Sequence, residues 1–427
     1  MSFTPPVVDT AQHLSSHFIL HLASALHAHG YSAHRLEAVL GEVAARLGVE
    51  AQFFTTPTSI FAAFGTQDAQ RTHLMRVEPG EPNLGHLSRL DGIMSEVIDG
   101  RITASEGSTR IVALLAEPPR WNRWQTLCAF VVASAAVSCF FGVTVFEAFI
   151  AGALGLVAGL CALAASRNAS LAPVLEPMTA GVVSTLAFFI SGLTTSGNAY
   201  QTSLAGLIVL LPGLTFTIGL TELSTRHLAS GTARLAGALV TFLGLGFGLA
   251  LGAKAGALLA ALVLNGDPAW IVESPRVAWW TEVPAAVLAP LCFAVLLRAD
   301  RKDVGWIVLA GIAAFVTSRF AGRAMGEELG AFLGALVVSA GSNLLERLRR
   351  ASAMVTQVPG LLILVPGSIG FRSVTSMLDN ETVLGVETAF RVAIIGISLA
   401  AGLLAGNVIT GLSRPEYAEG DRGNRSA

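Results

Sequence analysis

The chain has 427 residues, of which 13% are charged, against roughly 25% in a typical soluble protein. Basic and acidic residues nearly balance at 27 and 29, the mean hydropathy is +0.63, and no basic run is present. This composition excludes an ordinary soluble protein and gives no support to a nucleic-acid partner. The four cysteines lie in apolar blocks and indicate small apolar side chains, so no disulfide, metal site or other cofactor is expected.

Residues 1–124 are predicted to form a cytoplasmic α+β domain. No secretory signal is expected, because the first 12 residues contain two prolines and no basic segment. Thr103 or Ser105 is expected to cap the last helix of this domain. Periodicity and runs rich in Phe, Val and Thr predict, in chain order, helices over 14–28 and 33–47, strands over 51–56, 59–64 and 72–77, and helices over 84–98 and 104–115.

Ten apolar blocks follow, each close to the ~20 residues that a membrane helix needs. Five of them make a predicted membrane repeat over 125–264, and five make a second repeat over 283–412. Residues 265–282 carry three tryptophans beside acidic residues, which is typical of an outer interfacial connection. Residues 413–427 are expected to be a disordered cytoplasmic tail. The predicted spans are 125–142, 145–165, 178–195, 203–221, 234–254, 283–298, 304–321, 328–345, 358–375 and 389–412.

The strings Leu211-Pro212-Gly213 and Val365-Pro366-Gly367 lie 154 residues apart inside two of these blocks. The same offset superposes the first five spans on the last five, which indicates an internal duplication. With an odd number of spans per repeat, the second repeat must enter the membrane from the opposite side, so the repeats are predicted to be inverted. A short extra helix inside the apolar run 235–264 would change this parity.

The distribution of basic residues predicts the orientation in the membrane. With the N-terminus inside, the predicted inner loops hold twelve Lys and Arg residues and the outer side holds six. This excess favours a multi-pass protein of the cytoplasmic membrane with both termini in the cytoplasm.

Three segments resemble the threonine/serine exporter family (ThrE type). Residues 26–65, LHAHGYSAHRLEAVLGEVAARLGVEAQFFTTPTSIFAAFG, are similar to the family's N-terminal signature of a His-Gly turn, a downstream basic residue, a Leu-Gly-Val helix end and a Thr/Ser-rich strand. Residues 207–239 resemble its fourth span and residues 361–381 its ninth. The resemblance extends from about His21 to Leu412.

The resemblance implies an exporter of a small carboxylate-bearing metabolite in the inner membrane, with a hydroxy amino acid as the first choice. In some relatives the two halves occur on separate chains, and those forms are associated with export of a dicarboxylate. The motifs are more specific for the family than for the substrate.

The two Pro-Gly breaks are the main candidate binding elements. Proline removes a backbone donor, so backbone groups are freed at mid-membrane that protein, water or ligand must satisfy. A half-helix N-terminus also attracts a carboxylate. A packing kink is the alternative for a single break, whereas two equivalent breaks favour a functional discontinuity. The predicted substrate-binding residues are Pro212, Gly213, Thr215, Thr217, Thr221, Pro366, Gly367, Ser368, Arg372, Ser373 and Thr375, with Asn198 and Asn343 as further polar cavity residues.

Charged residues near the span ends supply further candidates. Arg372 could bind a carboxylate through two parallel hydrogen bonds. Glu222 and Glu387 are candidate proton carriers. The remaining charges near span ends are interpreted as interfacial anchors or ion pairs, among them Arg319, Arg323, Glu327 and Glu328.

Eight of the nine histidines precede Leu87, and His13, His17 and His21 would line one helix face. No carboxylate or cysteine completes a zinc site there, so this face is interpreted as solvated. The sequence also contains no phosphate-binding loop, ATPase signature or nucleophile elbow, which disfavours primary active transport and catalysis by this chain.

The sequence therefore predicts a proton-coupled secondary exporter, not an enzyme, that alternates access around broken helices four and nine. Its expected partners are a small-molecule substrate, the lipid bilayer and the proton gradient, and it could form a homo-oligomer. One alternative is a membrane-anchored enzyme or sensor whose active part is the N-terminal domain. Another is a channel, although no ring of charged residues favours one.

Overall fold

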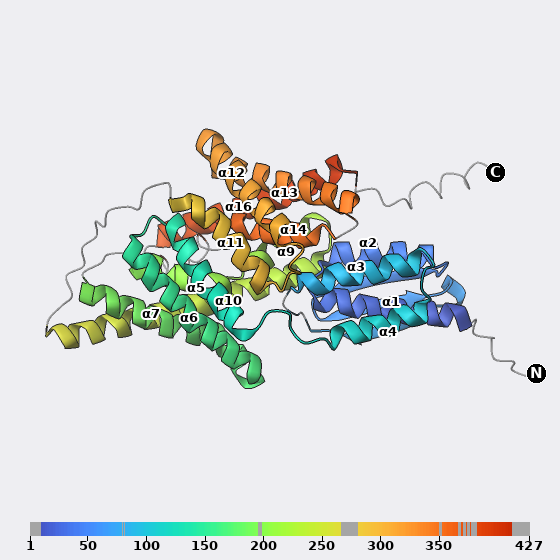
Figure 1. Ribbon diagram of the computed structural model, residues 1–427, viewed down its shortest axis with the longest axis horizontal. Helices are drawn as coiled ribbons and strands as arrows, with labels where there is room; N and C mark the ends of the chain where they lie inside the picture. Colours follow the sequence, from blue (N-terminus) through green and yellow to red (C-terminus); the bar gives the residue numbers. More distant parts are fainter. Residues whose placement is uncertain are drawn as a thin grey trace, which may run out of the picture.

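The computed structural model describes residues 10–78, 80, 82–194, 199–265, 281–349, 352–365, 369, 373, 376 and 382–411. The N-terminal helices and strands lie at one end of the long axis of the molecule, and the helices from α5 onward occupy the rest (Figure 1). The N-terminal elements are α1 (Thr10–Ala28), α2 (Ala33–Arg46), β1 (Ala51–Thr56), β2 (Ser59–Phe64), the 3-10 helix η1 (Gln67–Ala69), β3 (Arg71–Arg76), α3 (Leu84–Ile98) and α4 (Ala104–Leu115).

The sheet is antiparallel in the order β1-β2-β3, with Phe54 opposite Phe61 and Phe61 opposite Leu74. The predicted strands are confirmed to within one residue. Runs rich in aromatic and β-branched residues fit a pleated sheet and end at turn residues. Thr103, rather than Ser105, caps α4 by accepting a hydrogen bond from the Glu106 backbone.

The rest of the chain is helical. Its elements are α5 (Arg123–Phe140), α6 (Val145–Arg167), η2 (Ala169–Val174), α7 (Leu175–Thr194), α8 (Ala199–Gly206), η3 (Ile208–Leu210), α9 (Gly213–Ser224), α10 (Leu228–Leu264), α11 (Glu282–Leu296), α12 (Val304–Met325), α13 (Glu327–Arg349), α14 (Met354–Leu364) and α16 (Thr382–Ile409). Capping boxes at Asn122 and Thr144 fix the starts of α5 and α6.

Seven helices in the described part of the chain are long and apolar enough to cross a membrane, and the bent pair of α8 and η3–α9 makes an eighth. The predicted spans at 283–298 and 358–375 correspond to the shorter apolar helices α11 and α14. The apolar run 235–264 contains no additional helix, because α10 continues unbroken through 37 residues. At 1.5 Å per residue, α10 is far longer than the roughly 30 Å of a hydrocarbon core.

The predicted interruption of the fourth span is confirmed. α8 and η3–α9 are bent by 57°, Leu211 is extended, and α9 begins at Gly213 directly after Pro212. In the other half, α14 ends at Leu364 and Val365 is extended. Leu211 (φ −68°, ψ 130°) and Val365 (φ −65°, ψ 131°) thus share one conformation at equivalent positions, as expected for a residue before proline.

Glycines bring two helix pairs into close contact, α7 with α10 and α13 with α16. A Cβ atom on Gly248 would lie 2.2 Å from the Pro177 carbonyl oxygen, and one on Gly402 would lie 2.2 Å from that of Phe332. These two glycines are 154 residues apart. The contact that the first half makes is therefore made again by the second half.

The N-terminal elements share a core with the helices beyond them. Their apolar side chains, such as Phe18, Leu36 and Leu87, form one buried cluster that also includes Ala294, Ala299, Ile307, Met354, Val355 and Val358. Backbone hydrogen bonds join Leu84 N to Leu297 O at 2.9 Å and Gly85 N to Arg298 O at 3.2 Å. The start of α3 is therefore anchored on the loop that follows α11.

Candidate functional site

The residues around the first break differ in how far they are buried and in what their hydroxyl groups bind. Pro212 is half-buried and Gly213 is buried at the first turn of α9. Thr215 is half-buried, whereas Thr217 and Thr221 are buried on the same helix. The Thr217 and Thr221 hydroxyls donate to the carbonyl oxygens four residues earlier, at 3.1 and 2.9 Å. Their hydroxyl protons are thus used inside the helix, so they offer a ligand acceptor lone pairs only.

Most of the candidates around the second break lie outside the described residues, namely Pro366, Gly367, Ser368, Arg372 and Thr375, and so does Asn198. Ser373 is buried, and its hydroxyl donates to the Gly385 carbonyl at 2.6 Å. Asn343 is buried between α13 and α16, where its amide donates to Asn407 Oδ1 at 2.8 Å and Thr410 Oγ1 at 2.9 Å. It holds these two helices together and does not line the two cavities described next.

A first cavity, of about 400 Å³, lies between α5, η3, α11, α12, α13, α14 and α16. Its charged lining consists of Glu282, Arg319, Arg323 and Glu327. Arg319 is hydrogen-bonded to Glu282, and Glu327 forms an ion pair with Arg391 at 3.1 Å. Arg323 has no ion-pair partner among the described residues. Guanidinium groups and carboxylates therefore line the same cavity, whose other walls are mostly apolar.

A second cavity, of about 480 Å³, lies on the other side of the breaks. Leu211 and Gly213 line it, together with Trp121, Arg123 and Arg298. The N-terminal part contributes Pro82 to its wall. Arg298, which a sequence-only view would treat as an inert surface residue, is thus part of a cavity.

The two cavities lie at opposite ends of the same two helices. Helix α5 contributes Arg123 and Thr126 to the second cavity and Phe140 to the first, whereas α11 contributes Glu282 to the first and Leu296 to the second. Arg123 and Arg298, which were predicted to lie on the inner side, are therefore at the second cavity, whereas Arg319 and Arg323, predicted to lie on the outer side, are at the first.

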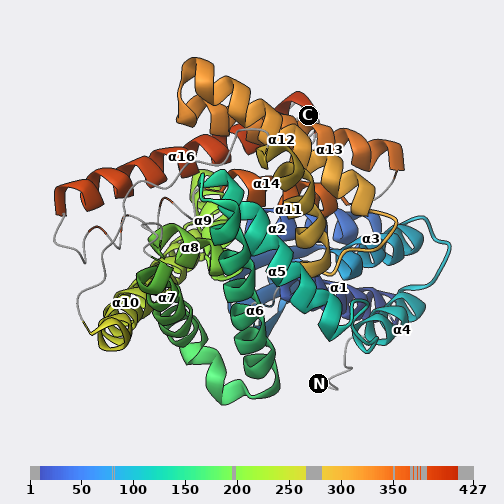
Figure 2. The ribbon, with the colours of Figure 1, turned by 60° about the vertical axis from the view of Figure 1, so that its left-hand side comes forward.

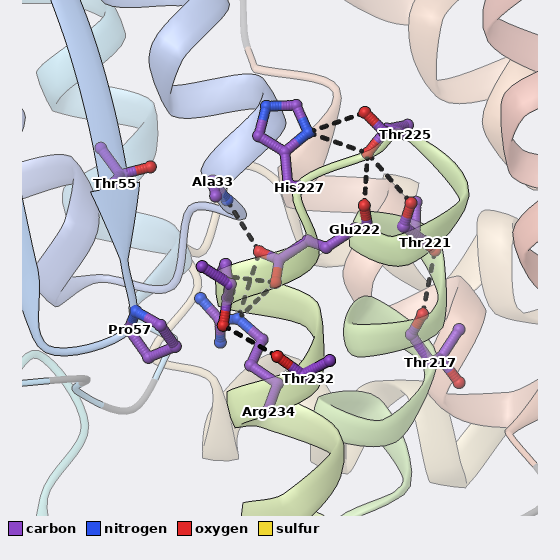
Figure 3. A network of polar contacts seen from close by, with 12 residues as sticks. Ala33, Thr55, Pro57, Thr217, Thr221, Glu222, Thr225, His227, Thr232 and Arg234 are labelled. Atoms are coloured by element: carbon purple, nitrogen blue, oxygen red, sulfur yellow. Dashed lines mark hydrogen bonds and ion pairs between the residues drawn. The ribbon is translucent and has the colours of Figure 1, made fainter.

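Glu222, at the end of α9, is fully buried and is held by three groups from two segments, α2 and α10 (Figure 3). Its Oε1 accepts a hydrogen bond from the Ala33 backbone N–H at 2.8 Å, and its Oε2 accepts one from the Ser230 hydroxyl at 2.7 Å. Arg234 Nε lies 3.2 Å from both carboxylate oxygens. Charge-assisted hydrogen bonds of this kind are about twice as strong as neutral ones, so the carboxylate fixes the start of α2 against α9 and α10.

The start of α2 also contacts the second interrupted segment. Arg35 Nη1 donates to Gln357 Oε1 of α14 at 2.7 Å, and Gln357 Nε2 donates to the Ser339 hydroxyl of α13 at 3.2 Å. The first turn of α2 therefore binds both α9 and α14, the helices at which the two breaks lie. Glu387, the other predicted proton carrier, is exposed on α16.

Sequence reasoning missed the roles of Glu282, Arg319 and Arg323 in the first cavity and the partners of Glu222. The spacing of Arg319 and Arg323 on one helix face was a usable signal, because it aims two cations in one direction. Nothing local to Glu222 indicated Ala33, which lies 189 residues away in the chain.

Together the fold and these cavities define a polytopic α-helical membrane protein with an interrupted helix beside a charged space, as in solute transporters. Family models of the threonine/serine exporter ThrE match residues 17–255 and residues 282–409. The chain belongs to the threonine/serine exporter family, a family of membrane exporters.

Among curated proteins, the chain is similar to pheromone-regulated membrane protein 10 of several fungi. It is 25% identical to that of Eremothecium gossypii, covering 96% of this chain and 58% of the relative. It is 29% identical to that of Candida albicans, covering 83% of this chain and 33% of the relative, and 25% identical to that of Saccharomyces cerevisiae, covering 88% and 50%. The chain thus spans about a third to three fifths of these relatives. No solved structure matches it.

Proposed function

We propose that this protein is a secondary active exporter of threonine, serine or a related small carboxylate-bearing metabolite across the cytoplasmic membrane. The observation that carries the proposal is the first cavity, where Arg319, Arg323, Glu282 and Glu327 converge beside the ends of the interrupted segments. An arginine suits a carboxylate, and a glutamate suits an ammonium group. A cavity of about 400 Å³ has ample room for a small amino acid.

Alternating access around two inverted five-helix repeats is the mechanism that we infer. The recurrence of the helix contacts, the matching conformations of Leu211 and Val365, and two cavities at opposite ends of α5 and α11 support it. Both termini would lie in the cytoplasm, on the side of the second cavity. Coupling to the proton gradient, through Glu222 or Glu387, belongs to the same proposal.

The proposal is tested with purified protein in liposomes and a panel of labelled amino acids and dicarboxylates, with and without a pH gradient. We expect saturable flux of threonine or serine. Because Arg323 is the cavity cation without an ion-pair partner in the described chain, Arg323→Ala should raise KM by about tenfold, the loss of one charge-assisted contact of about 1.4 kcal/mol.

Arg46→Ala is the matched control, because Arg46 is an exposed arginine on α2 whose contact is a weak pair with Glu42. Arg298 is unsuitable for this purpose, since it lines the second cavity. Pro366→Ala and Arg372→Ala are also expected to reduce flux. Absence of flux for every compound in the panel would end the exporter proposal.

A further inference from the structure

Four apolar side chains separate the two cavities. Ile208 of η3, Phe293 of α11, Leu362 of α14 and Val365 at the end of α14 are the residues that line both cavities. Phe293 is 8% exposed, and the other three are half-buried. These four residues, called the septum below, lie between the cavity that contains Arg123 and Arg298 and the cavity that contains Arg319 and Arg323.

The position of the septum follows the internal duplication. Ile208 and Leu362 are 154 residues apart, so each half contributes the same position, four residues before its Pro-Gly break. Val365 is the equivalent of Leu211, and it directly precedes the second break. Three of the four septum residues therefore lie on the short segments that end at the breaks.

This placement gives the septum the means to move. The 57° bend lies between α8 and η3–α9. Pro212 donates no backbone hydrogen bond, and the extended Leu211 before it separates η3 from the start of α9 at Gly213. η3 is consequently not part of one continuous helix with α9. It can therefore shift against α11 without breaking the hydrogen bonds of a continuous helix. Helix α9 is held separately through Glu222 and its partners.

We propose that the septum is the closed gate of the transport path, in which apolar side chains exclude water and polar solutes until η3 and the end of α14 separate. This inference rests on the proposed function but makes a prediction that does not need substrate. A constriction lined by apolar side chains blocks permeation by dewetting, so shortening its side chains should produce a passive leak.

The test compares neighbouring residues that differ in whether they line both cavities or only one. Ile208→Ala and Leu362→Ala shorten septum side chains, whereas Val209→Ala and Ile363→Ala shorten neighbours that line one cavity alone, the second and the first respectively. In proteoliposomes we expect the septum variants to raise the passive leak of a small ion by about tenfold, the change in rate that a barrier lowered by about 1.4 kcal/mol produces. The control variants should leak no more than the parent protein.

Thiol labelling tests the same gate without relying on alanine variants that fold poorly. In a background with the four native cysteines replaced, a membrane-impermeant reagent should modify Val209→Cys from the side of the second cavity and Ile363→Cys from the opposite side. Ile208→Cys and Leu362→Cys should be protected from both sides when no substrate is present. Equal leak for septum and control variants, or free labelling of the septum positions from both sides, would overturn the gate.

The two proposals fail in distinguishable ways. If the protein is a gated membrane path for another solute, amino-acid flux is absent but the septum variants still leak. If the septum is merely packing, the parent protein transports and the septum variants leak no more than their neighbours.

Discussion

At the scale of single residues, neutralising the buried carboxylate of Glu222 is expected to destabilise the protein strongly. It is 0% exposed and receives hydrogen bonds from Ala33, Ser230 and Arg234. Glu222→Gln keeps the shape but leaves Arg234, which is 13% exposed, without its counter-ion. Removing one partner of a buried pair costs about 3–5 kcal/mol, so we expect a marked fall in the melting temperature of the detergent-purified protein.

The control for this prediction is Glu42→Gln, which removes an exposed ion pair between Glu42 and Arg46 on α2. Such pairs contribute at most about 1 kcal/mol, so the melting temperature should barely change. In the double variant Glu222→Gln with Arg234→Gln, the loss should be smaller than the sum of the single losses. If Glu222→Gln melts together with Glu42→Gln, the carboxylate does not hold the start of α2.

His34 makes the stability of the N-terminal part depend on pH. Both of its ring nitrogens are buried and have no hydrogen-bond partner among the described residues. Burial, reinforced by Arg35, His227 and Arg234, lowers the pKa of His34 to about 3. In the unfolded chain the His34 ring takes up a proton below its usual pKa of 6.5, whereas in the folded chain it stays neutral. The contribution of His34 to the unfolding free energy is therefore complete above pH 6.5 and is lost as the pH falls.

For this one histidine, the loss between pH 8 and pH 5.5 is about 1.4 kcal/mol. His86, whose pKa burial lowers to about 4, contributes in the same direction. Asp91 acts in the opposite direction, because burial raises its pKa to about 6. His34→Phe should therefore reduce the fall in unfolding free energy over this range by about 1.4 kcal/mol relative to the parent, whereas His13→Phe, at an exposed position on α1, should not. Identical pH profiles for parent and His34→Phe would contradict the prediction.

At the scale of elements, the close contact of α7 with α10 depends on glycine. A Cβ atom on Gly252 would lie 2.3 Å from the Gly181 carbonyl oxygen and 2.8 Å from Ser184 Cβ. Gly252→Ala should force the two helices apart and destabilise the protein by about 1–3 kcal/mol, measured by thermal unfolding in detergent. Gly406→Ala, whose Cβ would lie 2.6 Å from that of Ser339, should do the same in the second half.

Gly237 lies on the same helix α10, and a Cβ atom there would have no neighbour within 4 Å. Gly237→Ala should therefore stabilise the protein by about 0.5–1 kcal/mol, because alanine loses less backbone entropy in a helix. If all three alanine variants behaved alike, helix propensity rather than interhelical distance would govern these positions.

The elements that sequence alone predicted are those set by local chemistry. The break before α9 follows from Pro212, and the strand limits follow from runs rich in Phe and Thr that end at turn residues. The cap of α4 at Thr103 was one of two neighbours that local sequence could not separate. The predicted span 283–298 matches α11 to within two residues. The predicted span 358–375 differs from α14, which begins at Met354 and ends at Leu364, although apolar residues continue past that end.

The site depends on side-chain partners and helix packing that local sequence does not give. The hydroxyls of Thr217 and Thr221 satisfy carbonyls of their own helix, a preference of threonine that competes with ligand binding. The convergence of Glu282, Arg319 and Arg323 depends on how α11, α12 and α13 pack, and no spacing in the chain encodes that.

At the scale of the whole molecule, the N-terminal elements and the helices beyond them fold around common contacts. Figure 2 shows α1–α4 packed close beside the helices from α5 onward. The shared apolar cluster includes Ala294, Ile307 and Met354, and polar contacts add Arg35 to Gln357, Trp121 Nε1 to the Ala299 carbonyl at 2.9 Å, and Arg120 to Asp300. The N-terminal part also forms part of the wall of the second cavity, because Pro82 and Trp121 line that cavity.

Removal of the N-terminal elements should therefore disrupt the rest of the chain. A chain that begins at Arg120 exposes the apolar side chains of Ile307, Met354 and Val358 and leaves Glu222 without the Ala33 N–H. Exposed apolar surface of this kind leads to aggregation. We expect a broad, aggregated profile in size-exclusion chromatography of the fluorescently tagged protein in detergent, whereas the full chain gives one symmetrical peak.

Co-expression of the two pieces, 1–119 and 120–427, is the matched control, because it restores every contact except the one peptide bond at the junction. It should recover the symmetrical peak and the flux of the full chain, and neither piece should be active alone. A membrane-anchored enzyme or sensor makes the opposite prediction, namely that 1–119 alone retains all activity. A truncated chain that stays monodisperse and transports at the full rate would show that the N-terminal contacts, Glu222 included, are dispensable for both folding and transport.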